Sequence, residues 1–293
     1  MEIFKTVFFM VALMLLFVVV GGMIGGVGGM MVAFCIALVM NFFSYFYSDK
    51  LILKRYNAQE LSSSHPLYHM TKRLCFKAGL ELPKLYIISD SVPNAFATGR
   101  NPANAAVALT TGLLDTLNDD EIAAVIAHEL GHVRHYDILT GSIAAVFAGG
   151  IAILANFAQF GAMLGNNQNR QNPFLIIALS IIMPLAATII QMSISRSREF
   201  EADRFSASIT NPNDLANALL KLEGSNAHTM VKNANEQTAH MFIISPFSGK
   251  NIASGISNLF RTHPTTRQRV ERLNELSHHN KNYQNPARKY FNS

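Results

Sequence analysis

Charged side chains are scarce in this chain of 293 residues, where Asp, Glu, Lys and Arg together make up 15% and hydrophobic residues make up 49%. No charged residue at all occurs in residues 6–48, 138–169 or 171–195. Uncharged apolar runs of this length exceed what a buried core helix requires, because roughly 20 apolar residues in a helix cross a bilayer. The composition therefore excludes an ordinary soluble protein and indicates a membrane protein.

Cysteine is nearly absent too: Cys35 lies in an apolar run and Cys75 in a polar segment. Two cysteines placed in this way cannot form a disulfide framework, and they fit a reducing compartment. A basic stripe interleaved with aromatic residues is also lacking, although the net charge is +5. The basic residues instead gather beside the apolar runs, where anionic lipid headgroups attract them. We therefore expect a lipid bilayer as a partner and no nucleic acid.

The apolar runs predict four membrane helices. We place these helices at about residues 3–20, 27–46, 138–160 and 174–192. The Gly-rich sequence 21–30 predicts a tight turn between the first two, and the polar sequence 166–172 predicts a loop between the last two. The first run could instead be the apolar core of a signal peptide, but it is long for one and lacks a small-residue cleavage site. The third run, rich in Gly and Ala, would also suit a hairpin packed on protein.

Positive residues beside the apolar runs predict how the helices are oriented. Those next to the polar segments are Lys50, Lys54, Arg55, Arg134, Arg196 and Arg198, whereas Arg170 lies on the opposite side. Because Lys and Arg are retained on the cytosolic side of a membrane, we expect both termini and the polar segments to face the cytosol.

The polar segments show the periodicities of a mixed α and β domain. Expected helices cover residues 67–78, 118–136, 195–207, 212–222 and 264–276, and expected strands cover 84–89 and 105–110. The best-defined helix starts at Asn118, because Glu121 three residues later completes a capping box. Residues 224–257 are rich in Asn, Ser and Gly and predict a loop, and the tail from residue 279 is polar and is expected to be mobile.

The sequence His128-Glu129-Leu130-Gly131-His132 is the sharpest signal in the chain. In a helix, a spacing of four places both imidazoles on one face, one turn apart, where they can bind one zinc ion. Glu129 then lies close to the same ion and can take a proton from a water bound there. We interpret Gly131, which costs helix stability, as leaving room beside the metal. The alternative is a helix face with two satisfied histidines and an exposed glutamate.

A catalytic zinc site needs a third protein ligand, and Glu199 is our candidate. Asp203 falls one turn later on the same helix face, where it can accept a hydrogen bond from a ligand histidine. Glu201 projects from another side and is expected to be solvated or paired with an arginine. The alternative is a charged helix face balanced by neighbouring arginines. The ligand set of two histidines and a glutamate favours zinc without excluding another divalent metal.

These motifs together resemble the HtpX family of bacterial membrane metallopeptidases, relatives of the CaaX prenyl endopeptidases. The resemblance runs along nearly the whole chain and also includes the Gly-rich turn and segments 41–45, 94–99 and 262–264. It implies one zinc ion per chain, bound by His128, His132 and Glu199, with Glu129 as catalytic base and Asp203 supporting a ligand. It also implies an enzyme of the bacterial inner membrane that degrades misfolded or damaged membrane proteins under stress.

The expected fold is mainly α, with four transmembrane helices and a cytosolic, zincin-like α+β metallopeptidase domain that contains a small sheet. Its segments are two transmembrane helices (1–48), the first half of the catalytic domain (49–137), a transmembrane hairpin (138–193), the second half of the catalytic domain (194–278) and a polar tail (279–293). His132 precedes the third apolar run by six residues and Glu199 follows the fourth by seven. We therefore expect the site on helical extensions of two spans, within about 10 Å of the membrane surface.

The remaining predicted site residues concern the substrate. We expect an extended polypeptide to add a strand to a sheet edge formed by 105–110, and its expected contacts are Asn94, Ala105, Val107 and Leu109. His263 and Arg269 are expected to stabilise the tetrahedral intermediate, because His263 lies at a helix N-terminus that favours negative charge. Families related to this one share the spacing of the two residues. The alternative is a capping histidine and a solvated arginine.

Membrane proteins and unfolded polypeptides are the expected substrates, and the sequence does not indicate an oligomeric state. A membrane scaffold without catalysis is disfavoured by Glu129, since a scaffold has no need of that acid. A transporter or channel is disfavoured by spans that lack acidic and basic residues. Among enzymes, the alternative is a processing peptidase for lipidated C-termini, which would need a prenyl-binding chamber that four spans are too few to build.

Overall fold

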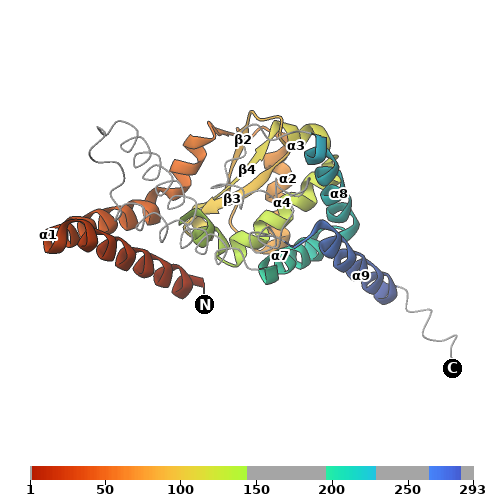
Figure 1. Ribbon diagram of the computed structural model, residues 1–293. Coiled ribbons are helices and arrows are strands. Elements are labelled where there is room, and N and C mark those ends of the chain that lie inside the picture. Colours follow the sequence, from red (N-terminus) through yellow and green to blue (C-terminus); the bar gives the residue numbers. More distant parts are fainter. Residues whose placement is uncertain (1, 144–195, 229–263, 285–293) are drawn as a thin grey trace, which may run out of the picture.

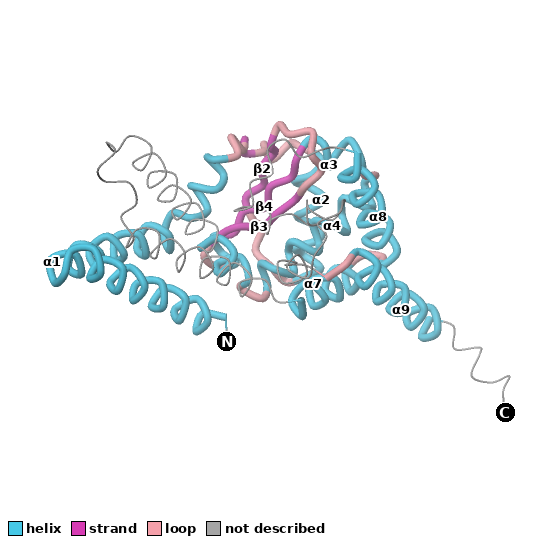
Figure 2. Tube along the Cα trace, viewed as in Figure 1, coloured by secondary structure: helices cyan, strands magenta, loops and turns pink. Residues whose placement is uncertain are grey.

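The computed structural model describes residues 2–143, 196–228 and 264–284, and its helices surround one small sheet (Figures 1 and 2). In chain order, the elements are α1 (Glu2–Arg55), β1 (Gln59–Glu60), α2 (Pro66–Ala78), β2 (Lys84–Ile88), β3 (Ala95–Gly99), η1 (Pro102–Asn104), β4 (Ala105–Thr110), α3 (Thr111–Thr116), α4 (Asp119–Arg134), α7 (Arg196–Ile209), α8 (Pro212–His228) and α9 (Thr266–Gln284). The expected mainly α character with a small mixed sheet is confirmed.

α1 folds back on itself into two helical arms that extend away from the sheet (Figure 1). The reversal lies in the predicted Gly-rich turn, where Gly26 adopts a φ of +59° that other residues rarely tolerate. The arms approach each other so closely that a Cβ on Gly21 would collide with the carbonyl of Gly29. The side-chain amide of Asn41 on the second arm also donates to the carbonyl of Met10 on the first, over 3.3 Å.

The second arm, Gly26–Arg55, is long and apolar enough to cross a membrane. Its large apolar side chains are mostly exposed, and Val27 is 77% exposed. The first arm contains a shorter apolar helix, Thr6–Val19. The fourth predicted span lies outside the described residues, and of the third only residues 138–143 are described, which are helical. Thr140 in this helix contacts Thr6 of the first arm through hydroxyls 2.9 Å apart.

The sheet has the strand order β1-β2-β4-β3. β2 and β4 are parallel, whereas β3 runs antiparallel to β4 with Ala97 opposite Val107. β4 is therefore an interior strand, and all of its residues are buried. The prediction that 105–110 forms the sheet edge was wrong, because the small-residue segment 95–99 pairs along its outer side. Among the strands that the structure describes, β3 is the edge strand next to α4.

α4 is the central helix of the domain, packed against β3, α2, α7 and α8. Its predicted capping box is present, with Asn118 and Glu121 exchanging side-chain to backbone hydrogen bonds of 2.9 Å. The core around it contains Ile126 and Leu130 of α4 with Leu219 of α8. Each such fully buried side chain contributes about 1.5–3 kcal/mol to stability. α4 is therefore held rigidly, as a metal-binding helix must be.

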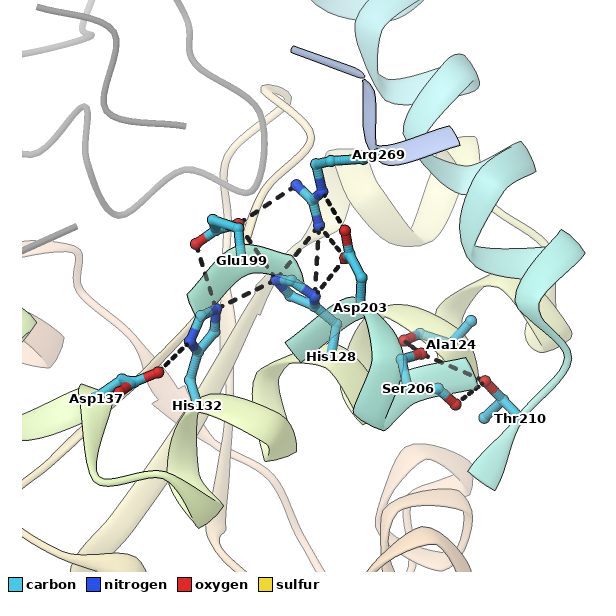
Figure 3. Close-up of polar contacts among 9 residues, drawn as sticks. All are labelled: Ala124, His128, His132, Asp137, Glu199, Asp203, Ser206, Thr210 and Arg269. Atoms are coloured by element: carbon cyan, nitrogen blue, oxygen red, sulfur yellow. Dashed lines mark hydrogen bonds and ion pairs between the residues drawn. The ribbon is translucent and has the colours of Figure 1, made fainter. Parts of the chain in front are cut away.

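The end of α4 differs from the expected continuous extension into the third span. The helix stops at Arg134, and Tyr136 has a φ of +63°, which an α-helix cannot contain. A new helical segment begins at Asp137. The break turns the chain back, so that Asp137 lies beside His132 (Figure 3).

α7 crosses close to α4 at Gly131. A Cβ on Gly131 would lie 3.0 Å from Cα of Ala202, so the glycine is needed for helix packing rather than for room beside a metal. The hydroxyl of Ser206 donates to the carbonyl of Ala124 over 2.7 Å and fixes the same crossing. This crossing brings the first turn of α7 over the His128–His132 face of α4.

Two helices are longer than expected. α8 continues past residue 222 to His228, through the start of the predicted loop at 224, and α9 continues past residue 276 to Gln284. The polar tail is therefore helical up to residue 284, because polarity alone does not stop a helix that a packed first half has nucleated. α9 begins after Thr265, whose hydroxyl accepts from the backbone N–H of Gln268 over 3.3 Å.

Candidate metal centre

Three side chains converge between α4 and α7: His128 and His132 from α4, and Glu199 from the first turn of α7 (Figure 3). The Nε2 atoms of the two histidines lie 3.2 Å apart. Glu199 places Oε1 3.5 Å from Nε2 of His132 and Oε2 3.7 Å from Nε2 of His128. One ligand atom from each of the three predicted ligands lies within 4.8 Å of the other two, so the three side chains form a compact triangle.

The size of this triangle fits a tetrahedral zinc ion. Ligand atoms about 2.1 Å from a tetrahedral ion are separated from one another by about 3.4 Å. The two Nε2 atoms lie 3.2 Å apart, close to that value, and each faces a different carboxylate oxygen of Glu199 at 3.5 or 3.7 Å. Three protein ligands leave the fourth position of the tetrahedron for water or substrate, which is typical of catalytic zinc sites.

Asp203, one turn after Glu199 on α7, contacts His128 on the side of the ring that faces away from the triangle. Oδ1 of Asp203 lies 2.9 Å from Nδ1 of His128, which leaves Nε2 directed at the triangle. Burial would raise the pKa of Asp203, but the neighbouring Arg269 and the hydrogen bond to His128 lower it below its usual value. Burial and the charge of Arg269 lower the pKa of His128. The contact agrees with the role expected for Asp203.

Arg269 of α9 is fully enclosed at the site, with 1% of its surface exposed. Its Nε and Nη2 donate to the two carboxylate oxygens of Asp203 over 2.9 and 2.6 Å. Its Nη1 also lies 3.5 Å from Oε2 of Glu199. The solvated arginine considered as an alternative is therefore wrong. His263, its expected partner, lies outside the described residues.

His132 has a corresponding support that the sequence did not predict. Oδ2 of Asp137 lies 3.1 Å from Nδ1 of His132, and Oδ1 of Asp137 accepts from Nη1 of Arg198. Burial opposes protonation of His132, but the hydrogen bond that its ring donates to Asp137 and the charges of Glu199 and Glu129 raise its pKa to about 9. An acid next to an apolar run was the available signal for Asp137.

Glu129 lies between the two histidines in sequence and is buried, with 4% of its surface exposed. Burial raises its pKa to about 7, the charge of His132 opposes this rise, and Glu199 adds to it. The backbone N–H of Ala97 on β3 donates a hydrogen bond to the Glu129 carboxylate. The expected catalytic base therefore faces the edge strand of the sheet.

The predicted substrate contacts are not where the sequence suggested. Ala105, Val107 and Leu109 belong to β4, which pairs with β2 on one side and β3 on the other, so an added strand cannot reach them. Asn94 is buried too, and its backbone pairs with Thr110 of β4. Glu201 is exposed on α7, as expected.

Known proteins share this arrangement of motifs. Residues 62–277 match the sequence profile of Peptidase family M48. The chain belongs to this family. The match contains the His128–His132 motif, Glu199 and Arg269.

Relatives of this M48 chain match it from end to end. It is 57% identical over 282 residues to a protein of Campylobacter concisus named "Protease HtpX homolog", a match that covers 94% of this chain and 97% of that protein. It is 59% identical to a protein of the same name from Campylobacter curvus, covering 96% and 100%. It is 49% identical to "Protease HtpX" of Legionella pneumophila, covering 93% and 98%. The predicted HtpX resemblance is confirmed.

A solved structure shares the fold of the M48 chain. The crystal structure of S. mikatae Ste24p aligns with a TM-score of 0.51 at 19% identity, over 82% of this chain. This chain spans 57% of that longer protein.

Proposed function

We propose that this M48 family member is a membrane-anchored, zinc-dependent endopeptidase that hydrolyses peptide bonds of misfolded or damaged membrane proteins on the cytosolic side. The observation that carries the proposal is the His128, His132 and Glu199 triangle with the buried Glu129 beside it. A scaffold would not need a buried acid next to such a triangle, because burying a carboxyl group costs free energy.

The chemistry is divided between the metal and the chain. Zinc bound in the triangle would polarise the scissile carbonyl and make water a stronger nucleophile. Glu129 accepts the proton of the attacking water and passes it to the leaving amine. Burial raises the pKa of Glu129, which makes it a stronger base than a solvated glutamate. Arg269, near Glu199, adds positive charge beside the reacting groups.

The edge of β3 supports a corrected proposal for substrate binding. Thr110 donates its backbone N–H to the carbonyl of Asn94, which fixes the alternation of the antiparallel pair. Ala95, Ala97 and Gly99 consequently direct their backbone groups away from β4. The N–H of Gly99 already donates to the hydroxyl of Ser142 over 3.3 Å, so an extended substrate can add a strand at Ala95 and Ala97, where Ala97 already contacts Glu129. We therefore propose β3 in place of β4 as the substrate strand.

The position of the second arm of α1 supports a membrane location for this site. Its last turns carry the aromatic residues Phe46 and Tyr47, with Lys50 over the ring of Tyr47 at 5.5 Å. Arg100, which follows β3, lies over the ring of Phe46 at 5.6 Å. Aromatic rings and basic groups gather at the cytosolic membrane interface. We propose that the end of β3 lies close to that interface, so that substrates arrive from the bilayer.

The function is tested by changing Glu129 to Gln in the purified protein. We expect zinc content to stay near one ion per chain, while hydrolysis of a labelled unfolded polypeptide falls by about 10²–10⁴-fold, as for loss of a general base. Glu121→Gln is the matched control, because Glu121 is another buried glutamate of α4 but lies in its first turn, two helical turns before His128. Hydrolysis that survives in Glu129→Gln, or that persists in the wild type after chelation, would overturn the proposal.

A further inference from the structure

The two histidines of the triangle are each held by an aspartate that is itself held by an arginine. His128 contacts Asp203, which binds Arg269. His132 contacts Asp137, which binds Arg198. All of these side chains are at least four-fifths buried. The M48 site therefore has two aspartate–arginine supports, one of which (Asp137 with Arg198) was not expected.

The second support joins two ends of a long segment. Asp137 begins the helix that enters the predicted third span, and Arg198 lies in the first turn of α7, just after the predicted fourth span. The pair therefore closes a loop of about 60 residues that contains the expected membrane hairpin. Arg198 also immediately precedes the ligand Glu199. A change in the distance between these two ends would move Asp137, which contacts His132, or Arg198, which is next to Glu199 in the chain.

The break at Tyr136 is what makes the contact possible. In a continuous helix, a residue five positions after His132 would point to a different side. The φ of +63° at Tyr136 turns the chain so that Asp137 reaches Nδ1 of His132. A carboxylate there accepts the Nδ1 proton, keeps the lone pair on Nε2 for the metal and fixes the ring plane.

We propose that Asp137 and Arg198 are a positioning pair, in which Arg198 orients Asp137 and Asp137 orients His132, so that metal affinity depends on the two ends of residues 138–195 being held together. The proposal rests on the proposed zinc site. It makes neither residue a group that touches the substrate. Its consequence is that residues at both ends of this segment help to orient the ring of His132.

Zinc and cobalt affinities of the full-length protein in detergent test the pair. Asp137→Ala should weaken zinc binding by about 10–100-fold, as for other groups that orient a ligand, and should change the visible absorption of the cobalt form. Asp137→Asn keeps an oxygen acceptor and should lose less. As a single substitution, Arg198→Ala should weaken zinc binding. Added to Asp137→Ala, it should have no further effect, because Arg198 acts through Asp137.

The double variant Asp137→Arg with Arg198→Asp tests whether the pair orients His132 or only links the two ends of the segment. It restores an ion pair across the hairpin but puts no acceptor beside Nδ1 of His132, so zinc affinity should stay low. Restored affinity in this variant would mean that the pair only ties the segments together. Glu121 lies at the N-terminal end of α4, away from the triangle, and pairs with Lys221 of α8. Glu121→Gln, which weakens this ion pair, should leave zinc affinity unchanged.

Two outcomes distinguish the failure of this inference from the failure of the proposed function. A wild type that binds no zinc at all would overturn both. A wild type that binds zinc, with an Asp137→Ala variant that binds it equally well and has the same cobalt spectrum, would overturn the positioning pair alone. If Asp137→Ala does not fold, Asp137→Asn gives the same comparison with the acceptor retained and the charge removed.

Discussion

Arg269 and Asp203 form a two-point ion pair inside the site, with Nε and Nη2 of the arginine 2.9 and 2.6 Å from the two carboxylate oxygens. The residues are 66 positions apart, on α9 and α7. Asp203 in turn holds His128, so a helix late in the chain determines the orientation of a ligand on α4. A guanidinium is suited to this position because its planar fork matches a carboxylate.

Removing the guanidinium should destabilise the protein. Arg269→Ala leaves the carboxylates of Asp203 and Glu199 buried without their cation, and breaking a buried pair in this way costs about 3–5 kcal/mol. The free energy of unfolding and the zinc content should both fall. Arg267→Ala, two residues earlier on the exposed face of α9 with a surface ion pair to Glu271, should leave the free energy of unfolding nearly unchanged. Equal effects at the two positions would contradict the buried-pair argument.

Substitutions of the three acidic residues of α7 should have three different effects on zinc affinity, measured by titration with the metal. Glu199→Ala removes a corner of the donor triangle and should abolish stoichiometric zinc binding. Asp203→Ala should weaken binding by about 10–100-fold because it frees His128 without removing a donor. Glu201→Ala should have little effect, since that side chain is exposed. A larger zinc loss at Glu201 than at Glu199 would be incompatible with the geometry of the site.

Gly131→Ala should act on the metal through helix packing. The added Cβ would lie 3.0 Å from Cα of Ala202 and push α7, with Glu199, away from the histidines. We expect lower stability and lower zinc affinity, measured by thermal unfolding and competition with a chelator. Gly224→Ala is the control, because a Cβ there meets nothing within 4 Å and alanine favours a helix by about 1 kcal/mol. An unchanged zinc affinity in Gly131→Ala would show that the crossing can relax.

The rate at which Cys75 is alkylated should report whether the protein is folded. Burial raises the pKa of its thiol to about 11, so at pH 8 only about one thiol in 10³ is the reactive thiolate. In a Cys35→Ser background, alkylation should be slow in the native state and fast in denaturant. Because an unfolded cysteine loses its proton near pH 8.5, stability should fall as the pH rises from about 9 to 11. Rapid native alkylation at pH 8 would contradict the burial of this residue.

The ligand helix could be predicted because its signals are local. Asn118 and Glu121 form the capping box that the sequence indicates, and the spacing of His128 and His132 fixes their common face. The position of Asp203 followed from a single helical turn after Glu199. In each case the residues lie on one regular helix, so the helical repeat is sufficient.

The remaining contacts depend on irregular or distant structure. Asp137 reaches His132 only because Tyr136 adopts a positive φ, which no residue pattern announced. Arg269 was expected near the reacting groups, but its pairing with Asp203 was not, because that contact follows from the packing of α9 on α7 and α8. The position of β4 was the avoidable error, since an apolar run such as Ala105–Thr110 is typical of a strand covered on both sides.

The order in which the helices leave the ribosome has a consequence for the assembly of the site. α4 is synthesised first, α7 follows after a long apolar segment, and α9 comes later still. A growing chain thus exposes the histidines well before the glutamate and the arginine that complete the site. We expect the complete site to form only after α9 is synthesised, because side chains from all three segments contact one another in it.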